Sequence, residues 1–229
     1  MIKKLFLSFA VFAVLFAQDK TEQEKSYPYE NEILQFEKMD RDSMPPANAV
    51  LFVGSSSIRI WKTLAEDMAP IPVINRGFGG SQAHQVLHYI HRIVFPYKPQ
   101  AIVFYEGDND IAAGKSPSQF IEECGVFMDS VYHRLPGVPV FFLSPKPSYA
   151  RIKLEPVRNE ACELLQKFCA SAKDAEYIDV STVMFDSEGT LKKDIFLDDQ
   201  LHMNAKGYVL WTKIIKKRLT DFLDKADSK

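Results

Sequence analysis

Residues 49–57 read AVLFVGSSS, and this stretch carries most of the information about the fold. Its five apolar residues have the length of a strand and are followed by a glycine and three serines. A short apolar run that ends at turn residues is typical of a strand buried on both faces, as in a parallel sheet. The serines therefore fall where the strand leaves the sheet, which is the edge at which α/β proteins bind their ligands.

The same kind of run recurs along the chain. Strand-length apolar segments are expected at 49–53, 72–74, 101–105, 138–143 and 176–180. Longer stretches repeat apolar residues at spacings of three and four, which predicts helices at 81–93, 117–135, 155–172 and 205–223. Strands that alternate with helices predict a three-layer α/β/α sandwich around a mostly parallel, five-stranded sheet.

Composition and charge narrow the function classes. The 229 residues are 46% hydrophobic and 25% charged, as expected for one globular domain with a sizeable core. The formal net charge of -2 gives little electrostatic support for nucleic-acid binding. The sequence has neither CxxC nor HExxH spacing, so we expect no metal site and no cofactor.

The first residues have the features of a secretory signal peptide. Lys3 and Lys4 precede an uncharged apolar run at 5–17, and we expect cleavage after Ala17. The run is shorter than the roughly 20 residues of a spanning helix, so no stable membrane span is expected after cleavage, although an uncleaved anchor stays open as an alternative. The predicted organisation is a signal peptide at 1–17, an N-terminal arm at 18–47 with a short amphipathic helix at 31–39, and the α/β/α domain at 48–225. The protein would be exported, to the periplasm or the medium.

The three cysteines do not imply a disulfide framework. Cys162 and Cys169 lie seven residues apart in an expected helix, roughly 10 Å of rise, which is too far for a bond between them. We expect buried free thiols, with one pair that involves Cys124 as the alternative.

Four short segments carry the residue types of one kind of chemistry. They are Gly54-Ser55-Ser56-Ser57, Gly79-Gly80-Ser81, Gly107-Asp108-Asn109-Asp110 and Asp199-Gln200-Leu201-His202. Each follows an expected strand or the loop after it. A hydroxyl, hydrogen-bond donors for an oxyanion and an Asp/His pair are what acyl transfer by a serine requires.

In this order the four segments resemble the four sequence blocks of the SGNH, or GDSL-type, esterases, and the resemblance spans residues 49–219. It implies a flavodoxin-like SGNH hydrolase fold and a serine esterase. By that resemblance Ser56 is the nucleophile, His202 the general base and Asp199 the group that orients the imidazole. The oxyanion donors that it implies are the backbone N–H groups of Ser56 and Gly80 and the side-chain amide of Asn109.

The chain departs from the family pattern at the first block. Ser55 stands where the family most often has aspartate, and three consecutive serines leave Ser55 and Ser57 as alternatives to Ser56. The stretch is not the G-x-S-x-G elbow of larger α/β-hydrolases either, because Ile58 stands where the second glycine would be.

Charged residues near the four segments have two interpretations. Arg59, Arg76, His84, Lys146 and Arg151 could border a pocket, but solvated or salt-bridged surface positions are favoured. Glu106 and Asp108 flank Asn109 and are expected to accept hydrogen bonds that stabilise its loop.

The sequence therefore predicts an exported serine esterase that hydrolyses short-chain acyl esters, with acetyl as a candidate. Its substrate partner would be a carbohydrate ester or a small-molecule ester; the oligomeric state is not predicted. An acyltransferase of the same family is one alternative. An inactive glycan-binding module is the other, although such a protein would be expected to lose Ser56, Asn109 or His202. Nucleotide binding is disfavoured because residues 77–80 match neither GxGxxG nor the P-loop.

Overall fold

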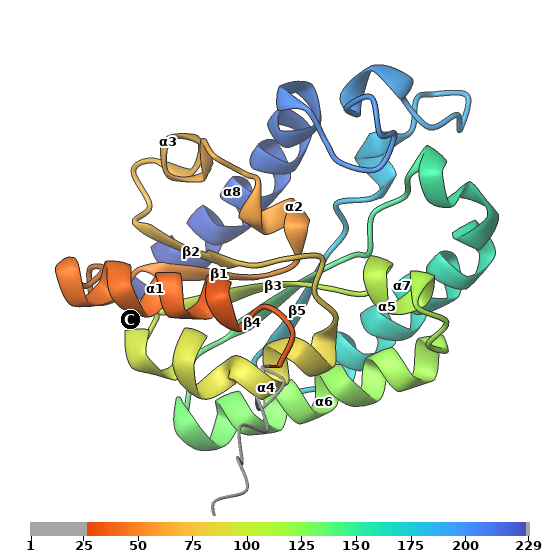
Figure 1. Ribbon diagram of the computed structural model, residues 1–229. Coiled ribbons are helices and arrows are strands. Elements are labelled where there is room, and N and C mark those ends of the chain that lie inside the picture. Colours follow the sequence, from red (N-terminus) through yellow and green to blue (C-terminus); the bar gives the residue numbers. More distant parts are fainter. Residues whose placement is uncertain (1–26, 228–229) are drawn as a thin grey trace, which may run out of the picture.

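A five-stranded parallel sheet forms the centre of the protein (Figure 1). The computed structural model describes residues 27–227. The strands are β1 (Val50–Gly54), β2 (Val73–Gly77), β3 (Ala101–Tyr105), β4 (Val140–Leu143) and β5 (Ala175–Ile178). They lie in the order β2-β1-β3-β4-β5, and all four neighbouring pairs are parallel. This is the flavodoxin-like strand order, so the predicted fold class is confirmed.

Helices cover both faces of the sheet (Figure 1). One face is covered by α1 (Glu30–Asp42), α4 (Ala83–Ile93), α6 (Pro117–Arg134) and α7 (Glu155–Ser171). The other face is covered by α2 (Ser56–Arg59), α3 (Leu64–Met68) and α8 (Ala205–Asp227), and α5 (Asp108–Ala112) follows β3. Short 3-10 turns lie at Phe95–Tyr97, Tyr149–Leu154, Thr182–Met184 and Lys193–Ile195.

The strands are apolar throughout because they are buried on both faces. In β1, Leu51 and Val53 contribute to the core beneath α4 and α6, while Val50 and Phe52 contribute to the core beneath α8. All four side chains are fully buried. Alternate side chains of a strand point to opposite faces, so a strand between two helical layers needs apolar residues at every position.

All five predicted strands and all four predicted long helices are present, with shifts at their ends. The helix expected at 205–223 continues to Asp227. Among the strands the largest shift is in β2, which was expected to end at Ile74 but continues to Gly77. Its last residues include Asn75 and Arg76, whose polar side chains interrupt the apolar run expected of a buried strand. Arg76 is nevertheless buried, because it pairs with Asp40 of α1 and donates to the Tyr97 hydroxyl at 2.6 Å.

The described part of the N-terminal arm begins at Tyr27 and contains α1, which confirms the helix expected at 31–39. The predicted signal peptide at 1–17 lies outside the described residues. Between residues 27 and 227, no helix is long and apolar enough to cross a bilayer. The three cysteines are free thiols, as expected, and burial raises the pKa of Cys124 well above its usual range.

Gly54 ends β1 and turns the chain toward the serines. Its φ of 148° lies in the region that favours glycine, and the Ser55 N–H then donates to the Tyr105 carbonyl at 3.2 Å. A Cβ atom at position 54 would lie 2.1 Å from the same carbonyl oxygen. The close approach of β1 and β3 at this point therefore requires glycine.

We expect Gly54→Ala to lower the free energy of unfolding by about 3 kcal/mol or more, because the new methyl group would force the ends of β1 and β3 apart. The measurement is urea unfolding followed by circular dichroism. Gly125→Ala is the matched control, since Gly125 lies inside α6 and its Cβ would be 3.9 Å from Phe168. That control should be neutral or stabilising by up to about 1 kcal/mol. Equal stability of Gly54→Ala and the wild type would contradict this account of the turn.

Candidate active site

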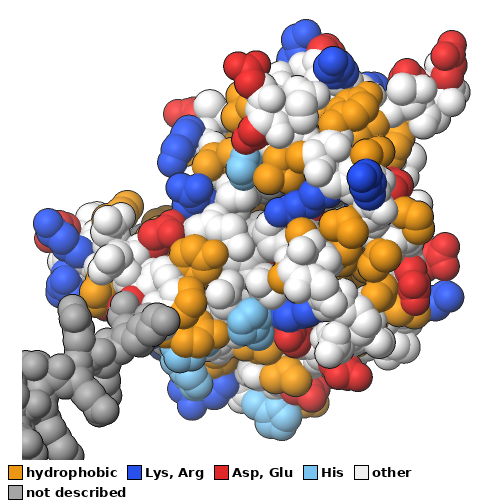
Figure 2. All heavy atoms as spheres, turned by 45° about the vertical axis from the view of Figure 1, so that its right-hand side comes forward, with side chains coloured by type: hydrophobic (Ala, Val, Ile, Leu, Met, Phe, Trp, Pro, Cys, Tyr) orange, Lys and Arg blue, Asp and Glu red, His pale blue; other side chains and the backbone are white. Residues whose placement is uncertain are grey.

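The four segments singled out in the sequence meet at the carboxyl edge of the sheet. Ser56 follows β1, the loop at 77–81 (the glycine loop) follows β2, Asn109 follows β3, and the segment at 199–202 lies between β5 and α8. Figure 2 turns this side of the molecule toward the viewer. Acidic and basic side chains are interspersed there with hydrophobic ones rather than gathered by sign.

Ser56, His202 and Asp199 form one chain of hydrogen bonds. The Oγ atom of Ser56 lies 3.0 Å from Nε2 of His202. On the other side of the ring, Nδ1 of His202 lies 2.6 Å from Oδ2 of Asp199. With Nδ1–H donating to the carboxylate, Nε2 is free to accept the proton of the hydroxyl.

The local backbone holds Asp199 and His202 in one turn. Oδ1 of Asp199 accepts the backbone N–H groups of Leu201 and His202, both at 2.9 Å, and Gln200 adopts a φ of 54°. Burial acts to raise the pKa of Asp199, but hydrogen bonds from the His202 side chain and from these N–H groups outweigh it and lower this pKa to about 2. The carboxylate therefore stays charged across the physiological range.

The three serines have different surroundings. Ser55 and Ser57 are 1% and 2% exposed, whereas Ser56 is 9% exposed and begins α2. The Ser57 carbonyl accepts the Tyr208 hydroxyl of α8 at 2.9 Å, which ties α2 to that helix. Of the three hydroxyls, the structure brings that of Ser56 to His202.

Asn109 and Gly80 lie next to each other beside this chain. The Nδ2 group of Asn109 donates to the Ser81 carbonyl at 3.0 Å, and a Cβ atom at Gly80 would be 3.8 Å from Nδ2. One hydrogen of this amide therefore remains for another acceptor. The backbone N–H groups of Gly80 and Ser56 make no hydrogen bond within residues 27–227, so they too are available to an acceptor.

Arg151 holds the other end of the Asn109 amide. Its Nη2 donates to Oδ1 of Asn109 at 2.7 Å, and its Nη1 lies 3.2 Å from Oδ2 of Asp108. Lys146, 2% exposed, donates to the same Asp108 oxygen at 3.1 Å. Burial acts to raise the pKa of Asp108, but the positive charges of Lys146 and Arg151 lower it below its usual value.

These contacts of Lys146 and Arg151 differ from the surface positions expected from the sequence. Both residues follow β4, and nothing in their local sequence indicates that they reach the loop after β3. The parallel order of the sheet, in which β3 and β4 are neighbours, is the signal that could have placed them there. Arg76, another of the five residues considered, faces α1 instead.

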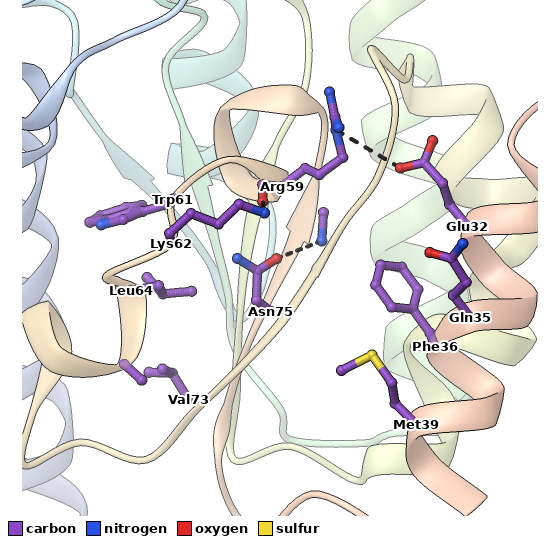
Figure 3. Close-up of a pocket in the computed structure, with 12 residues that line it drawn as sticks. Glu32, Gln35, Phe36, Met39, Arg59, Trp61, Lys62, Leu64, Val73 and Asn75 are labelled. Atoms are coloured by element: carbon purple, nitrogen blue, oxygen red, sulfur yellow. Dashed lines mark hydrogen bonds and ion pairs between the residues drawn. The ribbon is translucent and has the colours of Figure 1, made fainter.

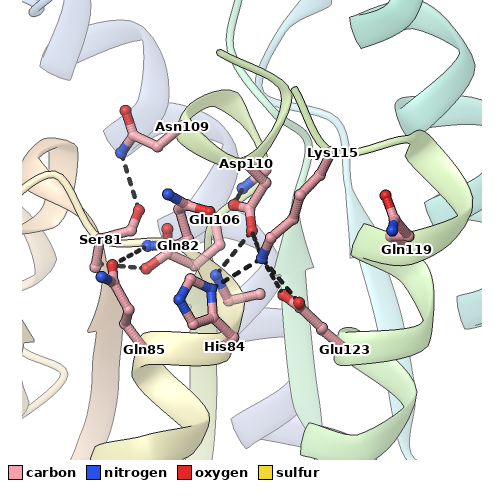
Figure 4. Close-up of polar contacts among 12 residues, drawn as sticks. Ser81, Gln82, His84, Gln85, Glu106, Asn109, Asp110, Lys115, Gln119 and Glu123 are labelled. Carbon is pink, nitrogen blue, oxygen red and sulfur yellow. Dashed lines mark hydrogen bonds and ion pairs between the residues drawn. The ribbon is translucent and has the colours of Figure 1, made fainter. Parts of the chain in front are cut away.

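A second polar cluster lies beside Ser81 of the glycine loop (Figure 4). Nζ of Lys115 is 2.9 Å from Oδ1 of Asp110, 2.9 Å from Nδ1 of His84 and 2.6 Å from the Glu123 carboxylate. Asp110, His84 and Glu123 are close enough together to hold a metal ion, but the lysine ammonium already provides the positive charge between them. Burial opposes that charge, yet the hydrogen bonds to Glu123 and Asp110 raise the pKa of Lys115.

Asp110 connects this cluster to the site. Its Oδ1 also accepts the Ala83 N–H and its Oδ2 the Gly107 N–H, each at 3.0 Å. Burial raises the pKa of Asp110. Burial also raises the pKa of Glu106, and the nearby charge of Asp110 adds to this effect. Glu106 accepts a hydrogen bond from the Ser81 hydroxyl. The loops that carry Gly80 and Asn109 are therefore joined through buried acids, as expected for Glu106.

This arrangement can transfer a proton from a hydroxyl to an imidazole whose other nitrogen is held by a charged carboxylate. Hydrogen-bond donors from Ser56, Gly80 and Asn109 lie around the same edge and can receive a developing negative charge. Both features are required for covalent catalysis by a serine.

The chain matches one protein family and is similar in fold to many solved structures. The model of the GDSL-like lipase/acylhydrolase family matches residues 53–210. No curated protein sequence matches the chain significantly.

Solved structures with the same fold share little sequence with the chain. A candidate platelet activating factor from Streptococcus pneumonia has a TM-score of 0.74 at 22% identity, over 83% of this chain and 92% of that one. A GDSL-like lipase from Bacteroides thetaiotaomicron has a TM-score of 0.68 at 17% identity, over 82% and 97%. A catalytic mutant of an acetylxylan esterase from Geobacillus stearothermophilus has a TM-score of 0.63 at 11% identity, over 76% and 94%.

We expect Lys115→Met to lower the free energy of unfolding by about 2 kcal/mol, because it leaves the buried Asp110 without its cation. Chemical unfolding measures the change. Lys217→Met is the control: Lys217 pairs with Asp221 on the surface of α8, and its loss should leave stability unchanged. Equal effects of the two substitutions would refute the role of the Lys115 ammonium as the buried counter-ion.

Proposed function

The chain belongs to the GDSL-like lipase/acylhydrolase family and is a hydrolase of carboxylic esters, and on this premise we propose that it is an exported serine esterase that removes short acyl groups through an acyl-enzyme on Ser56. The main support for the proposal is the chain of hydrogen bonds at the site: Ser56 Oγ lies 3.0 Å from His202 Nε2, and His202 Nδ1 lies 2.6 Å from Asp199 Oδ2.

The reaction begins with Ser56. Its Oγ attacks the ester carbonyl carbon while Nε2 of His202 takes the hydroxyl proton. The carbonyl oxygen becomes negatively charged and is stabilised by Asn109 Nδ2 and the N–H groups of Gly80 and Ser56. The bond to the leaving oxygen then breaks, and the imidazolium gives that oxygen its proton. An alcohol leaves and the acyl group remains on Ser56.

A water molecule completes the cycle by the same steps. His202 takes a proton from the water as its oxygen attacks the acyl carbon, and then returns the proton to Ser56 Oγ as the acid leaves. Asp199 keeps the imidazole in the required orientation and stabilises its positive charge. Because the pKa of Asp199 is lowered to about 2, this support is present above that pH and is lost only as the carboxylate is protonated below it.

Short acyl groups and a carbohydrate alcohol are the favoured substrate class. The sequence between the four segments contains no insertion long enough for an apolar lid, and an open site gives little binding energy to a long acyl chain. Two of the similar structures are named as an acetylxylan esterase and an acetyl esterase. Export of the protein is proposed on the sequence of residues 1–17 alone.

Ser56→Ala and His202→Ala should each reduce kcat on p-nitrophenyl acetate by about 10³-fold or more, because either change removes the attacking group or its base. Both variants should remain folded. His133→Ala is the control, since His133 is exposed and its contacts, with the Asp129 carbonyl and the Tyr132 ring, lie within its own helix. Full activity in either site variant would rule out this assignment.

We expect kcat/KM to fall by about 10-fold or more from p-nitrophenyl acetate to the octanoate, because the sequence contains no apolar lid that would bury the longer chain. Steady-state kinetics over a series of acyl lengths makes the comparison. A maximum at the octanoate would contradict the preference for short acyl groups while leaving the serine mechanism intact.

A further inference from the structure

Helix α1 lies outside the residues that the family model matches, yet it is firmly attached to the domain. Arg92 of α4 donates to Glu37 at 2.6 Å and to Glu30 at 2.8 Å. Near the other end of the helix, Asp40 pairs with the buried Arg76 of β2. These contacts fix the position of α1 along the edge of the sheet.

Glu32 of α1 reaches the glycine loop. Its carboxylate accepts the Gly79 N–H, with distances of 3.0 Å to Oε2 and 3.2 Å to Oε1. Figure 3 shows Glu32 extending from α1 toward Arg59, the last residue of α2. Nε of Arg59 lies 3.9 Å from Oε2 of Glu32, so the carboxylate has a positive charge close to it.

Tyr29 contacts the same loop. A Cβ atom at Gly79 would lie 2.1 Å from the Tyr29 ring, so the ring packs directly on the backbone of the loop. Gly79 adopts a φ of 44°, a conformation that an L side chain rarely takes. Tyr29 and Glu32 therefore support one side of the glycine loop, and Asn109 holds Ser81 on the other.

This support matters because Gly79 and Gly80 have no side chains with which to hold their own backbone. Glycine has more conformational freedom to lose than any other residue, so a Gly-Gly segment keeps one conformation only where its surroundings impose it. The Gly80 N–H is a proposed oxyanion donor, and such a donor lowers the barrier only if it already points at the developing charge.

We propose that Glu32 is a positioning residue of the active site: by accepting the Gly79 N–H it holds the glycine loop in the conformation that directs the Gly80 N–H at the oxyanion. This inference rests on the proposed esterase function. The part played by Glu32 is geometric, because a carboxylate near a developing oxyanion would by its charge alone oppose the reaction. The positive charge of Arg59 beside the Glu32 carboxylate reduces this repulsion.

The test compares three variants by kcat and KM on p-nitrophenyl acetate and by thermal unfolding. Glu32→Ala removes the acceptor and should lower kcat by about 10- to 100-fold with little change in KM, because a displaced donor fails mainly in the transition state. Glu32→Gln keeps an oxygen that accepts the N–H and should restore most of the lost kcat. Glu37→Ala is the matched control, since Glu32 and Glu37 lie on the same helix with side chains 33% and 31% exposed. Glu37 does not bond to the glycine loop, and in that variant the bond of Arg92 to Glu30 and the pair of Arg76 with Asp40 still hold α1 in place.

The outcomes separate this inference from the proposed function. An inactive wild type would refute the esterase itself. If the wild type is active, the positioning role is overturned by a Glu32→Ala variant with normal kcat, by a Glu32→Gln variant as slow as Glu32→Ala, or by an equal loss in Glu37→Ala. A loss of kcat in Glu32→Ala that Glu32→Gln reverses and Glu37→Ala does not share supports it.

Discussion

The parallel direction of all five strands is the constraint on which the rest of this molecule depends. It brings every strand's carboxyl end to one edge, so that residues as far apart as Ser56 and His202 lie 3.0 Å from each other. The turn at Gly54 then determines how closely the first serines approach β3. A site assembled from loop residues is thus held by the most buried part of the structure, and its geometry follows from the packing of the sheet.

The proposed oxyanion donors depend on a further set of side chains that do not themselves contact a substrate carbonyl. Arg151 holds the Asn109 amide, Asp110 joins the two loops, and Glu32 holds Gly79. Each of these contacts comes from a different element: the turn after β4, α5 and α1. Buried charged groups are tolerated at these positions because each is paired, as Asp108 is with Lys146 and Arg151.

Much of the fold could be predicted from the sequence because its strands are buried on both faces and read as continuous apolar runs. The end of β2 was missed since Asn75 and Arg76 are polar, and their burial depends on partners from other elements. The short helix α2 was missed as well, because four residues are too few to show a period. Ser56, Asp199, His202, Gly80 and Asn109 were proposed from local motifs. Arg151 and Glu32 have no such motif, because their positions depend on which strands and helices are neighbours in space.

The proposed mechanism depends on activation of the Ser56 hydroxyl by His202. The most direct measurement is to treat the purified protein with a fluorophosphonate probe and to locate the adduct by peptide mass spectrometry, in the wild type and in His202→Ala. We expect a single adduct on Ser56 that forms in the wild type and is lost without the imidazole. A folded protein that remains unlabelled, or an adduct on Ser55 or Ser57, would contradict it.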